Sequence, residues 1–282
     1  MPVLSCRLLA AVALLAGLAT GAGGVRAETY QTCTGFIDSI PATITTQGVW
    51  CLRKDLSTAM TSGTAITIAT NNVTIDCNDF KIGGLAAGTA SLTHGITAGE
   101  RSNAVVRHCN VRGFMYGIHL RGYGHLVEDN RFDNNLVQGI HVEGHDSIVR
   151  RNRVLDTGGY PASNRSYGIF ATGDVVDNIV SGVYALGTSP LVRGIYLLGS
   201  MATARGNRVR DLSASAGSSA VGLLVEGVGN AIVDNQVSVN SGHEGTGISA
   251  GGVTGSACTG NFVYGFATGI LNCRDGGGNT VL

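Results

Sequence analysis

A glycine followed by isoleucine or leucine recurs through most of the chain at intervals of 22 to 29 residues, at Gly95, Gly117, Gly139, Gly168, Gly194, Gly222, Gly247 and Gly269. An asparagine with valine or phenylalanine two residues later follows six of these glycines by 10 to 14 residues, at Asn130, Asn152, Asn178, Asn207, Asn235 and Asn261. Because the two marks keep step, each repeat is expected to form one structural unit that stacks on its neighbours.

Within each repeat, apolar residues alternate with polar ones, as in residues 139–144 and 148–154. This alternation indicates β-strands, and helical spacing is absent, which excludes a coiled coil and a helical bundle. Three short strands per repeat would let the chain coil once per repeat and lay each strand parallel to the one before it, about 4.8 Å away. Buried asparagines at one bend would pass side-chain hydrogen bonds from coil to coil, a structural role.

The composition agrees with a chain that bends often. Of 282 residues, 43 are glycine and only 4 are proline, and we expect many of the glycines at bends, where a positive φ angle is common. The 19 Lys and Arg residues balance the 19 Asp and Glu residues, and the arginines are spread singly. We therefore expect no nucleic-acid partner.

The N-terminal segment has the pattern of an export signal. Residues 1–27 contain an early arginine, an apolar run over residues 8–19 and a small-residue cleavage site at residues 25–27. The apolar run is too short to span a bilayer, so we expect no membrane span. These features predict a signal peptide over 1–27 and a secreted or periplasmic mature protein.

Six cysteines remain after removal of the signal peptide: Cys33, Cys51, Cys77, Cys109, Cys258 and Cys273. An even number in an oxidising compartment favours disulfides. Nearness in the chain or in the stack favours Cys33 with Cys51, Cys77 with Cys109, and Cys258 with Cys273. Free, buried thiols are the alternative.

The repeated Gly-Ile and Asn-x-Val marks resemble the right-handed parallel β-helix repeat of the pectate-lyase-like superfamily, over about residues 65–282. Residues 33–37, 41–44, 48–52 and 72–77 look like the opening coils and cap of exported bacterial members without an assigned activity. The resemblance implies an all-β fold, a single-stranded right-handed parallel β-helix (solenoid) of about nine to ten coils. We expect an N-terminal cap and first coil over 28–64 and the β-helix over 65–282.

Charged residues near the asparagine bend form two columns in which the sign alternates. Arg107, Glu128 and Arg150 share one column, and His108, Asp129, Arg151 and Asp177 share the next. Alternating signs let a solvated sheet face neutralise itself, so we interpret both columns as structural.

The outward positions after each Gly-Ile pair are the candidates for function. The third residue of each segment is Thr97, His119, His141, Phe170, Tyr196, Leu224 and Ser249 in successive repeats, and Arg121 and Glu143 follow two of them. We expect Phe170 and Tyr196 to present rings to a sugar chain along the axis. Longer connections at residues 158–165, 186–190 and 213–217 would wall one side, and the first adds the substrate-binding candidates Tyr160 and Arg165. The alternative is that these rings only pack under the loops.

Neighbouring coils would also bring together three possible metal ligands, His119, His141 and Glu143. Further ligands could come from the next bend, at His125, His145 and Asp146. No rigid ligand motif such as His-Glu-x-x-His is present, so the sequence analysis predicts no metal site and no cofactor.

Two functions follow. The first is an exported β-helix protein that binds polysaccharide or another cell-surface glycan without a demonstrable catalytic motif. The second is a polysaccharide lyase or epimerase acting on uronate polymers, with His119 or His141 as base, Arg121 stabilising the enolate and Glu143 orienting them. Calcium would be a cofactor only of a lyase, and neither the aspartate cluster of pectate lyases nor the Asp-Pro-His motif of alginate epimerases is present. The oligomeric state is left open.

Overall fold

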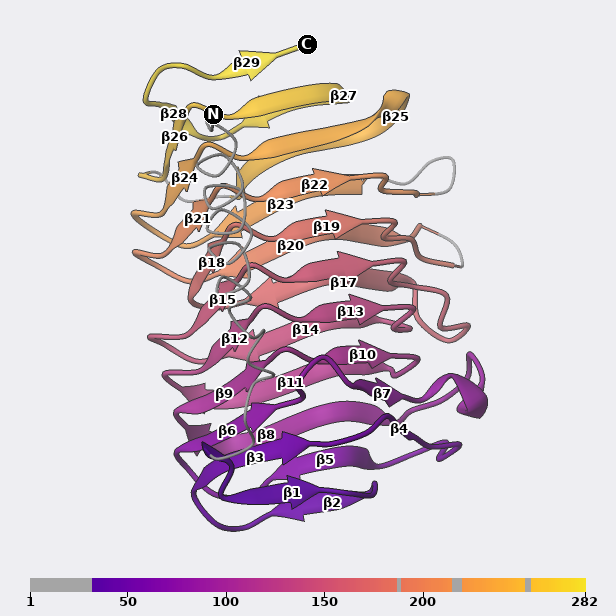
Figure 1. Ribbon diagram of the computed structural model, residues 1–282. Coiled ribbons are helices and arrows are strands. Elements are labelled where there is room, and N and C mark those ends of the chain that lie inside the picture. The colour runs from indigo at the N-terminus through magenta and orange to yellow at the C-terminus, as the bar shows by residue number, and fades with distance from the viewer. Residues whose placement is uncertain (1–31, 187–188, 215–219, 252–254) are drawn as a thin grey trace, which may run out of the picture. The chain divides into compact units, whose positions relative to one another are not determined.

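The computed structural model describes residues 32–282 except 187–188, 215–219 and 252–254, and the side chains of residues 241–244 are also excluded. The expected signal peptide, and parts of the connections 186–190 and 213–217, lie outside the described residues. Residues Cys33–Leu282 form one compact unit, a stack of parallel strands (Figure 1). Among the described residues from Cys33 on, the only helical element is a 3-10 turn, η2 (Leu85–Ala87).

Each coil contributes a long strand followed by two shorter ones, and every pairing between coils is parallel. The long-strand sheet contains β2 (Ala42–Ile44), β5 (Thr64–Ile68), β8 (His94–Ser102), β11 (Tyr116–Tyr123), β14 (Gln138–Glu143), β17 (Arg165–Ala171), β20 (Leu191–Leu198), β23 (Ala220–Glu226) and the later parts of β25 (Gln236–Gly251) and β27 (Phe262–Leu271).

Two further faces complete the coil. The second sheet contains β1 (Gly35–Ile37), β3 (Gly48–Leu52), β6 (Val73–Asp76), β9 (Ala104–Arg107), β12 (Leu126–Glu128), β15 (Ile148–Arg150), β18 (Asp174–Val176), β21 (Thr203–Arg205), β24 (Ala231–Val233), β26 (Ala257–Thr259) and β28 (Arg274–Asp275). The third face contains β4 (Leu56–Ser57), β7 (Lys81–Gly83), β10 (Asn110–Arg112), β13 (Arg131–Asp133), β16 (Arg153–Leu155), β19 (Ile179–Ser181), β22 (Arg208–Arg210), the early parts of β25 and β27, and β29 (Thr280–Val281).

The fold is therefore the predicted all-β parallel solenoid, with slightly fewer coils than predicted. About eight coils in the described residues have three strands of at least three residues each. The first and last coils are rudimentary, because β4, β28 and β29 have two residues each. Without these two terminal coils, the number of coils is slightly below the predicted nine to ten.

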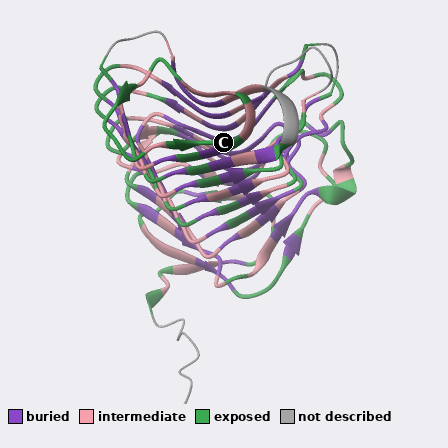
Figure 2. Ribbon diagram, turned by 90° about the horizontal axis from the view of Figure 1, so that it is seen from above, coloured by how far each residue is buried: buried purple, intermediate pink, exposed green. Residues whose placement is uncertain are grey.

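Inward side chains fill a narrow apolar core. Isoleucines occupy the same place in successive long strands and are fully buried at Ile96, Ile118, Ile140, Ile169, Ile195 and Ile248. Seen from the direction of Figure 2, buried residues recur along the strands and exposed ones gather at the bends. Strands buried on one side and parallel to their neighbours explain why Ile, Val and Leu recur at these positions.

The asparagines at one bend form a continuous ladder. The ladder consists of Asn130, Asn152, Asn178, Asn207, Asn235, Asn261 and Asn279. From Asn152 on, each Oδ1 accepts the backbone N–H and the side-chain NH₂ of the asparagine one coil earlier, at 2.9–3.1 Å. The first Oδ1 accepts the N–H of Cys109. The ladder satisfies backbone groups that each bend would leave buried and unpaired.

The glycines of the Gly-Ile pairs differ from the glycines that have a positive φ angle, such as Gly122, Gly144 and Gly206. None of the repeated glycines has a positive φ angle; the positive-φ residues near the ladder are the ones just before its asparagines, such as Asp129, Asp177 and Gly206. A Cβ on Gly168 would lie 2.4 Å from a methyl of Val180 and 2.6 Å from the carbonyl oxygen of Gly194. These glycines are therefore needed for close approach between coils and not for a bend.

The charged columns form ion pairs between neighbouring coils. Arg150 pairs with Glu128 at 2.7 Å, Arg151 with Asp129 at 2.7 Å, and Arg107 with Asp76 at 2.8 Å. Opposite charges on adjacent strands agree with the structural interpretation of these columns.

Three disulfides join the six cysteines, in the same pairs that the sequence analysis favours. Cys33 is bonded to Cys51, Cys77 to Cys109 and Cys258 to Cys273. The disulfides are consistent with an oxidising, extracellular environment. Among the described residues, no helix is long and apolar enough to cross a membrane.

Replacing a central ladder residue should destabilise the whole stack. Asn178→Ala removes the acceptor of the buried Asn152 N–H and the donor to the Val149 carbonyl, so we expect the free energy of unfolding to fall by about 2–4 kcal/mol. Urea denaturation followed by circular dichroism measures this change. Asn164→Ala, at an exposed loop position, is the matched control and should be within ~0.5 kcal/mol of the wild type. Equal stabilities of the two variants would contradict the ladder's role.

Candidate functional site

The outward face of the long strands carries three rows of side chains in register. The central row, two residues after each glycine, is the predicted one, and the pairing of β8, β11, β14, β17, β20, β23 and β25 aligns Thr97, His119, His141, Phe170, Tyr196, Leu224 and Ser249. In the downstream row, two residues later, Arg121 is aligned with Glu143. The register therefore brings the four predicted catalytic residues together on β11 and β14.

A further row lies immediately before the glycines and was missed by the sequence analysis. This upstream row consists of His94, Tyr116, Gln138, Tyr167 and Arg193. It was missed because the glycine and the following isoleucine are both buried, so that outward positions lie three residues apart here instead of two. The signal in the sequence was the recurrence of aromatic and long polar residues directly before the repeated glycine.

The two rows build one continuous cluster of rings. The ring of His119 lies 4.4 Å from that of His141 and 5.4 Å from that of Tyr116, while His94 stacks on Tyr116 at 4.9 Å. On the other side, His141 lies 4.5 Å from the ring of Phe170. We call this set, continued by Tyr167 and Tyr196, the ring cluster; it extends across five adjacent coils.

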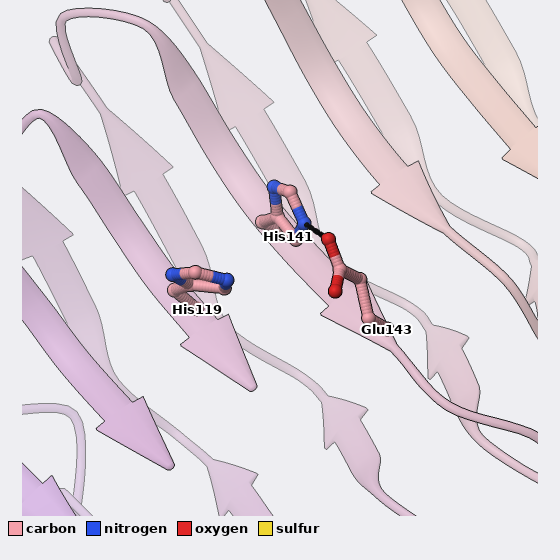
Figure 3. Close-up of side chains that lie close together, drawn as sticks. All are labelled: His119, His141 and Glu143. Atoms are coloured by element: carbon pink, nitrogen blue, oxygen red, sulfur yellow. Dashed lines mark hydrogen bonds and ion pairs between the residues drawn. The ribbon is translucent and has the colours of Figure 1, made fainter. Parts of the chain in front are cut away.

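His141 is fixed by polar contacts at both ring nitrogens. Its Nδ1 lies 2.6 Å from Gln138 Oε1. Its Nε2 lies 2.7 Å from Glu143 Oε1, the contact drawn in Figure 3. The other oxygen of Glu143 is 3.3 Å from Arg121 Nε, and Arg121 also pairs with Glu100 at 2.9 Å. Glu143 thus orients His141, while Arg121 bridges two carboxylates.

His119 lacks such partners. Its Nε2 is buried and has no hydrogen-bond partner among the described residues. Burial, followed by the proximity of His141 and His94, lowers the pKa of His119 to about 4, so this imidazole is neutral near pH 7. The ring therefore offers a buried nitrogen that no neighbouring group uses.

The pKa values of the neighbouring titratable groups are also shifted, and burial is the largest influence on each of them. Burial lowers the pKa of His94 and of His141 and raises that of Tyr116. For Glu143, burial acts to raise the pKa, but the hydrogen bond and charge of His141 and the nearby His119 and Arg121 outweigh it, so the pKa is lowered. Glu143 is therefore an ionised carboxylate at neutral pH.

The aromatic end of the cluster is less open than the sequence analysis expects. Phe170 and Tyr167 are each only 9% exposed, because neighbouring rings cover them. Tyr196 is half-buried and donates a hydrogen bond to Glu226; burial and then this bond raise its pKa to about 12. The guanidinium of Arg193 lies 4.6 Å from the ring centre of Tyr196. Phe170 therefore lies beneath the surface of the ring cluster, and Tyr196 and Arg193 lie at its edge.

The remaining candidates lie apart from the ring cluster. Tyr160 is half-buried in the connection before β17, where its backbone N–H bonds to the Leu136 carbonyl, and Arg165 is exposed at the start of β17. No ring contact joins Tyr160 to the cluster among the described residues. His125 is buried at a bend with its Nδ1 3.3 Å from the Ala104 N–H, and His145 and Asp146 are exposed.

Two shallow hollows lie next to the downstream end of the long strands. One, of about 220 Å³, is lined by Glu100, Arg121, Tyr123, Glu143 and His145, so it adjoins the His141–Glu143 pair. The other, of about 330 Å³, is lined by polar bend residues that include His145, Asp146, Thr172, Asp174 and Ser200. The smaller hollow therefore lies directly next to the ring cluster, and its lining is mostly polar.

Comparison with known proteins supports the fold. The family described as "Right handed beta helix region" matches residues 52–191, and no curated protein matches the chain. Among solved structures, the Dettilon tailspike protein has a TM-score of 0.50 at 20% identity, covering 86% of this chain and 56% of the tailspike chain. The A-module of the mannuronan C-5 epimerase AlgE4 from Azotobacter vinelandii has a TM-score of 0.47 at 12% identity, covering 89% of each chain.

A DFA-IIIase from Arthrobacter chlorophenolicus has a TM-score of 0.45 at 14% identity, covering 80% of this chain and 65% of the enzyme. The chain spans just over half the length of the tailspike chain. At 20% identity, the likeness to the tailspike shows the fold alone, because unrelated functions share one fold.

The buried, neutral His119 predicts a specific loss of stability in acid. Between pH 6.5 and about 4 the unfolded chain binds a proton at this residue and the folded chain does not, so stability present above pH 6.5 is lost as the pH falls. His119→Gln should therefore lose less stability than the wild type between about pH 7 and about pH 5 in urea denaturation. His145→Gln, which removes an exposed imidazole, is the control. A wild-type pH dependence in His119→Gln would contradict the prediction.

Proposed function

The chain is a right-handed parallel β-helix protein, and we propose that the outer face of its long-strand sheet binds a polysaccharide that runs along the helix axis. One observation carries the proposal: the ring cluster presents side chains of a similar kind on adjacent coils, spaced by the strand separation of about 4.8 Å. A linear polymer of repeating sugars is the ligand class that matches such a one-dimensional repeat.

The chemistry of the face suits sugars. Tyr116 and Tyr196 are half-buried rings that keep a polar hydroxyl, and aromatic rings of this kind contact the apolar faces of sugars. Gln138, Arg193 and Arg121 border the rings with amide and guanidinium groups that can bond hydroxyl or carboxylate oxygens. Phe170, buried beneath its neighbours, would contribute shape more than contact area. Tyr160 and Arg165 would lie at the border of the same face, on the side where the strands begin.

A glycan array with the purified protein would identify the ligand, and titration calorimetry would then give its affinity. We expect Tyr196→Ala and Tyr116→Ala each to weaken binding about tenfold or more, which corresponds to ~1.4 kcal/mol. Tyr264→Ala is the matched control, because Tyr264 is an exposed tyrosine, 45% accessible, on the third face. No glycan bound on the array, or equal losses in all three variants, would contradict the proposal.

One observation favours a second candidate, a lyase or epimerase of uronate polymers. His119 is neutral at pH 7, and its Nε2 has no hydrogen-bond partner among the described residues. It lies beside the His141–Glu143 pair and close to Arg121 of the downstream row. In this reaction His119 would take the proton next to the sugar carboxylate, and Arg121 would stabilise the enolate that forms. Glu143, fixed by Arg121, would orient His141 as the second proton carrier.

A panel of uronate polymers separates this candidate from simple binding. A lyase forms an unsaturated product that absorbs in the ultraviolet, and an epimerase incorporates deuterium from D₂O at the sugar carbon. If the protein is an enzyme, we expect one of these signals, and its loss by about 10²-fold or more in His119→Gln. Absence of both signals on polymers that the protein binds would exclude the catalytic candidate and leave binding as the function.

A further inference from the structure

We propose that His119, His141 and Glu143 form a binding site for one divalent transition-metal ion of the zinc class. The sequence analysis predicts no metal here, because these residues form no recognised ligand motif. In the structure, however, one ligand atom from each of the three residues lies within 4.8 Å of the others. They form the only group of three or more His, Cys, Asp or Glu residues with this geometry among the described residues.

The stack itself positions the ligands. His119 and His141 are direct neighbours in the pairing of β11 with β14, and Glu143 is two residues after His141, on the same face (Figure 3). Metal–nitrogen and metal–oxygen distances for zinc are about 2.0–2.2 Å, so small side-chain rotations would bring the three ligands around one ion. The ligands come from strands whose register is fixed by the coils on either side.

Two of the three ligands are already oriented by other residues. Gln138 contacts Nδ1 of His141 at 2.6 Å, which leaves Nε2 directed at Glu143. Arg121 contacts one oxygen of Glu143 and leaves the other facing the histidine. Partners that hold the far side of each ligand are typical of metal sites, where they fix ring orientation and raise affinity.

His119 supplies an independent observation that favours a metal ligand at this position. Its Nε2 is buried without a hydrogen-bond partner in the described part of the chain, and such a group costs about 1–3 kcal/mol when it is left unpaired. Coordination of the imidazole would use a ring that otherwise makes only ring contacts, with His141, Tyr116 and His94.

The ligand set selects the class of ion. Two imidazoles and one carboxylate suit Zn²⁺ and similar divalent transition metals. The same set does not suit Ca²⁺, which takes six to eight oxygen ligands, so a calcium site of the lyase type does not fit these residues. Three protein ligands leave a fourth position open, toward the face on which we propose that the polysaccharide lies.

Titration calorimetry of tag-free, chelator-treated protein with Zn²⁺ tests the proposal. We expect one ion per chain, a raised melting temperature on binding, and at least tenfold weaker binding in His119→Gln and in His141→Gln. Gln138→Leu removes only the group that orients His141 and should weaken binding by about 10- to 100-fold. Co²⁺ in place of Zn²⁺ should give a visible absorption spectrum of four- or five-coordinate type that is lost in His119→Gln.

His108→Gln is the control, because His108 lies at a bend beside Asp76 and outside the ligand group. Circular dichroism of each variant establishes that it is folded, and His119→Gln alone suffices if His141→Gln does not fold. Absence of Zn²⁺ binding, unchanged affinity in folded His119→Gln, or an equal loss in His108→Gln would overturn the proposal. Glycan binding measured on the chelator-treated protein is a separate result, so the metal site and the proposed function can fail independently.

Discussion

The asparagine ladder is the interaction on which the rest of this structure depends. At this bend the chain turns sharply while its backbone groups are buried. From Cys109 on, the asparagine oxygen of the next coil accepts the N–H that the turn would leave unpaired. The side-chain NH₂ of Asn152, for example, donates to the Val127 carbonyl on the coil before and to the Asn178 Oδ1 on the coil after. A central asparagine thus joins three successive coils. This arrangement allows little slip between coils, because a shift by one residue would break bonds along the whole column.

The functional face follows from that fixed register. Once the bends are aligned, the residues at a constant offset from each bend must lie next to one another on the outer surface. His119 and His141 are 22 residues apart in the chain, yet their ring centres are 4.4 Å apart. The repeated glycines contribute to this arrangement as well. In the strands that carry both rows, each glycine and the isoleucine after it are both buried, so the upstream and central rows are separated by two buried residues in each strand.

Sequence reasoning predicts the parts of the structure that follow from the repeat and misses those that depend on local departures from it. The parallel solenoid and the alignment of the central row were predictable, since both need only the period. The upstream row was not, because the rule of alternating faces fails at the buried Gly-Ile pair. The close approach between coils that requires the repeated glycines also appears only in the structure. Likewise, only three-dimensional packing reveals that Phe170 is covered and that His119 has a nitrogen without a partner.

The central claim is that function resides on the outer face of the long strands. Side-chain footprinting by hydroxyl radicals, with and without the polysaccharide that binds best, tests this most directly, because it reports which tyrosines and histidines the ligand covers. The account predicts protection of Tyr116, His141 and Tyr196, with Tyr264 on the third face unchanged. Protection of Tyr264 with the long-strand face still reactive would contradict it.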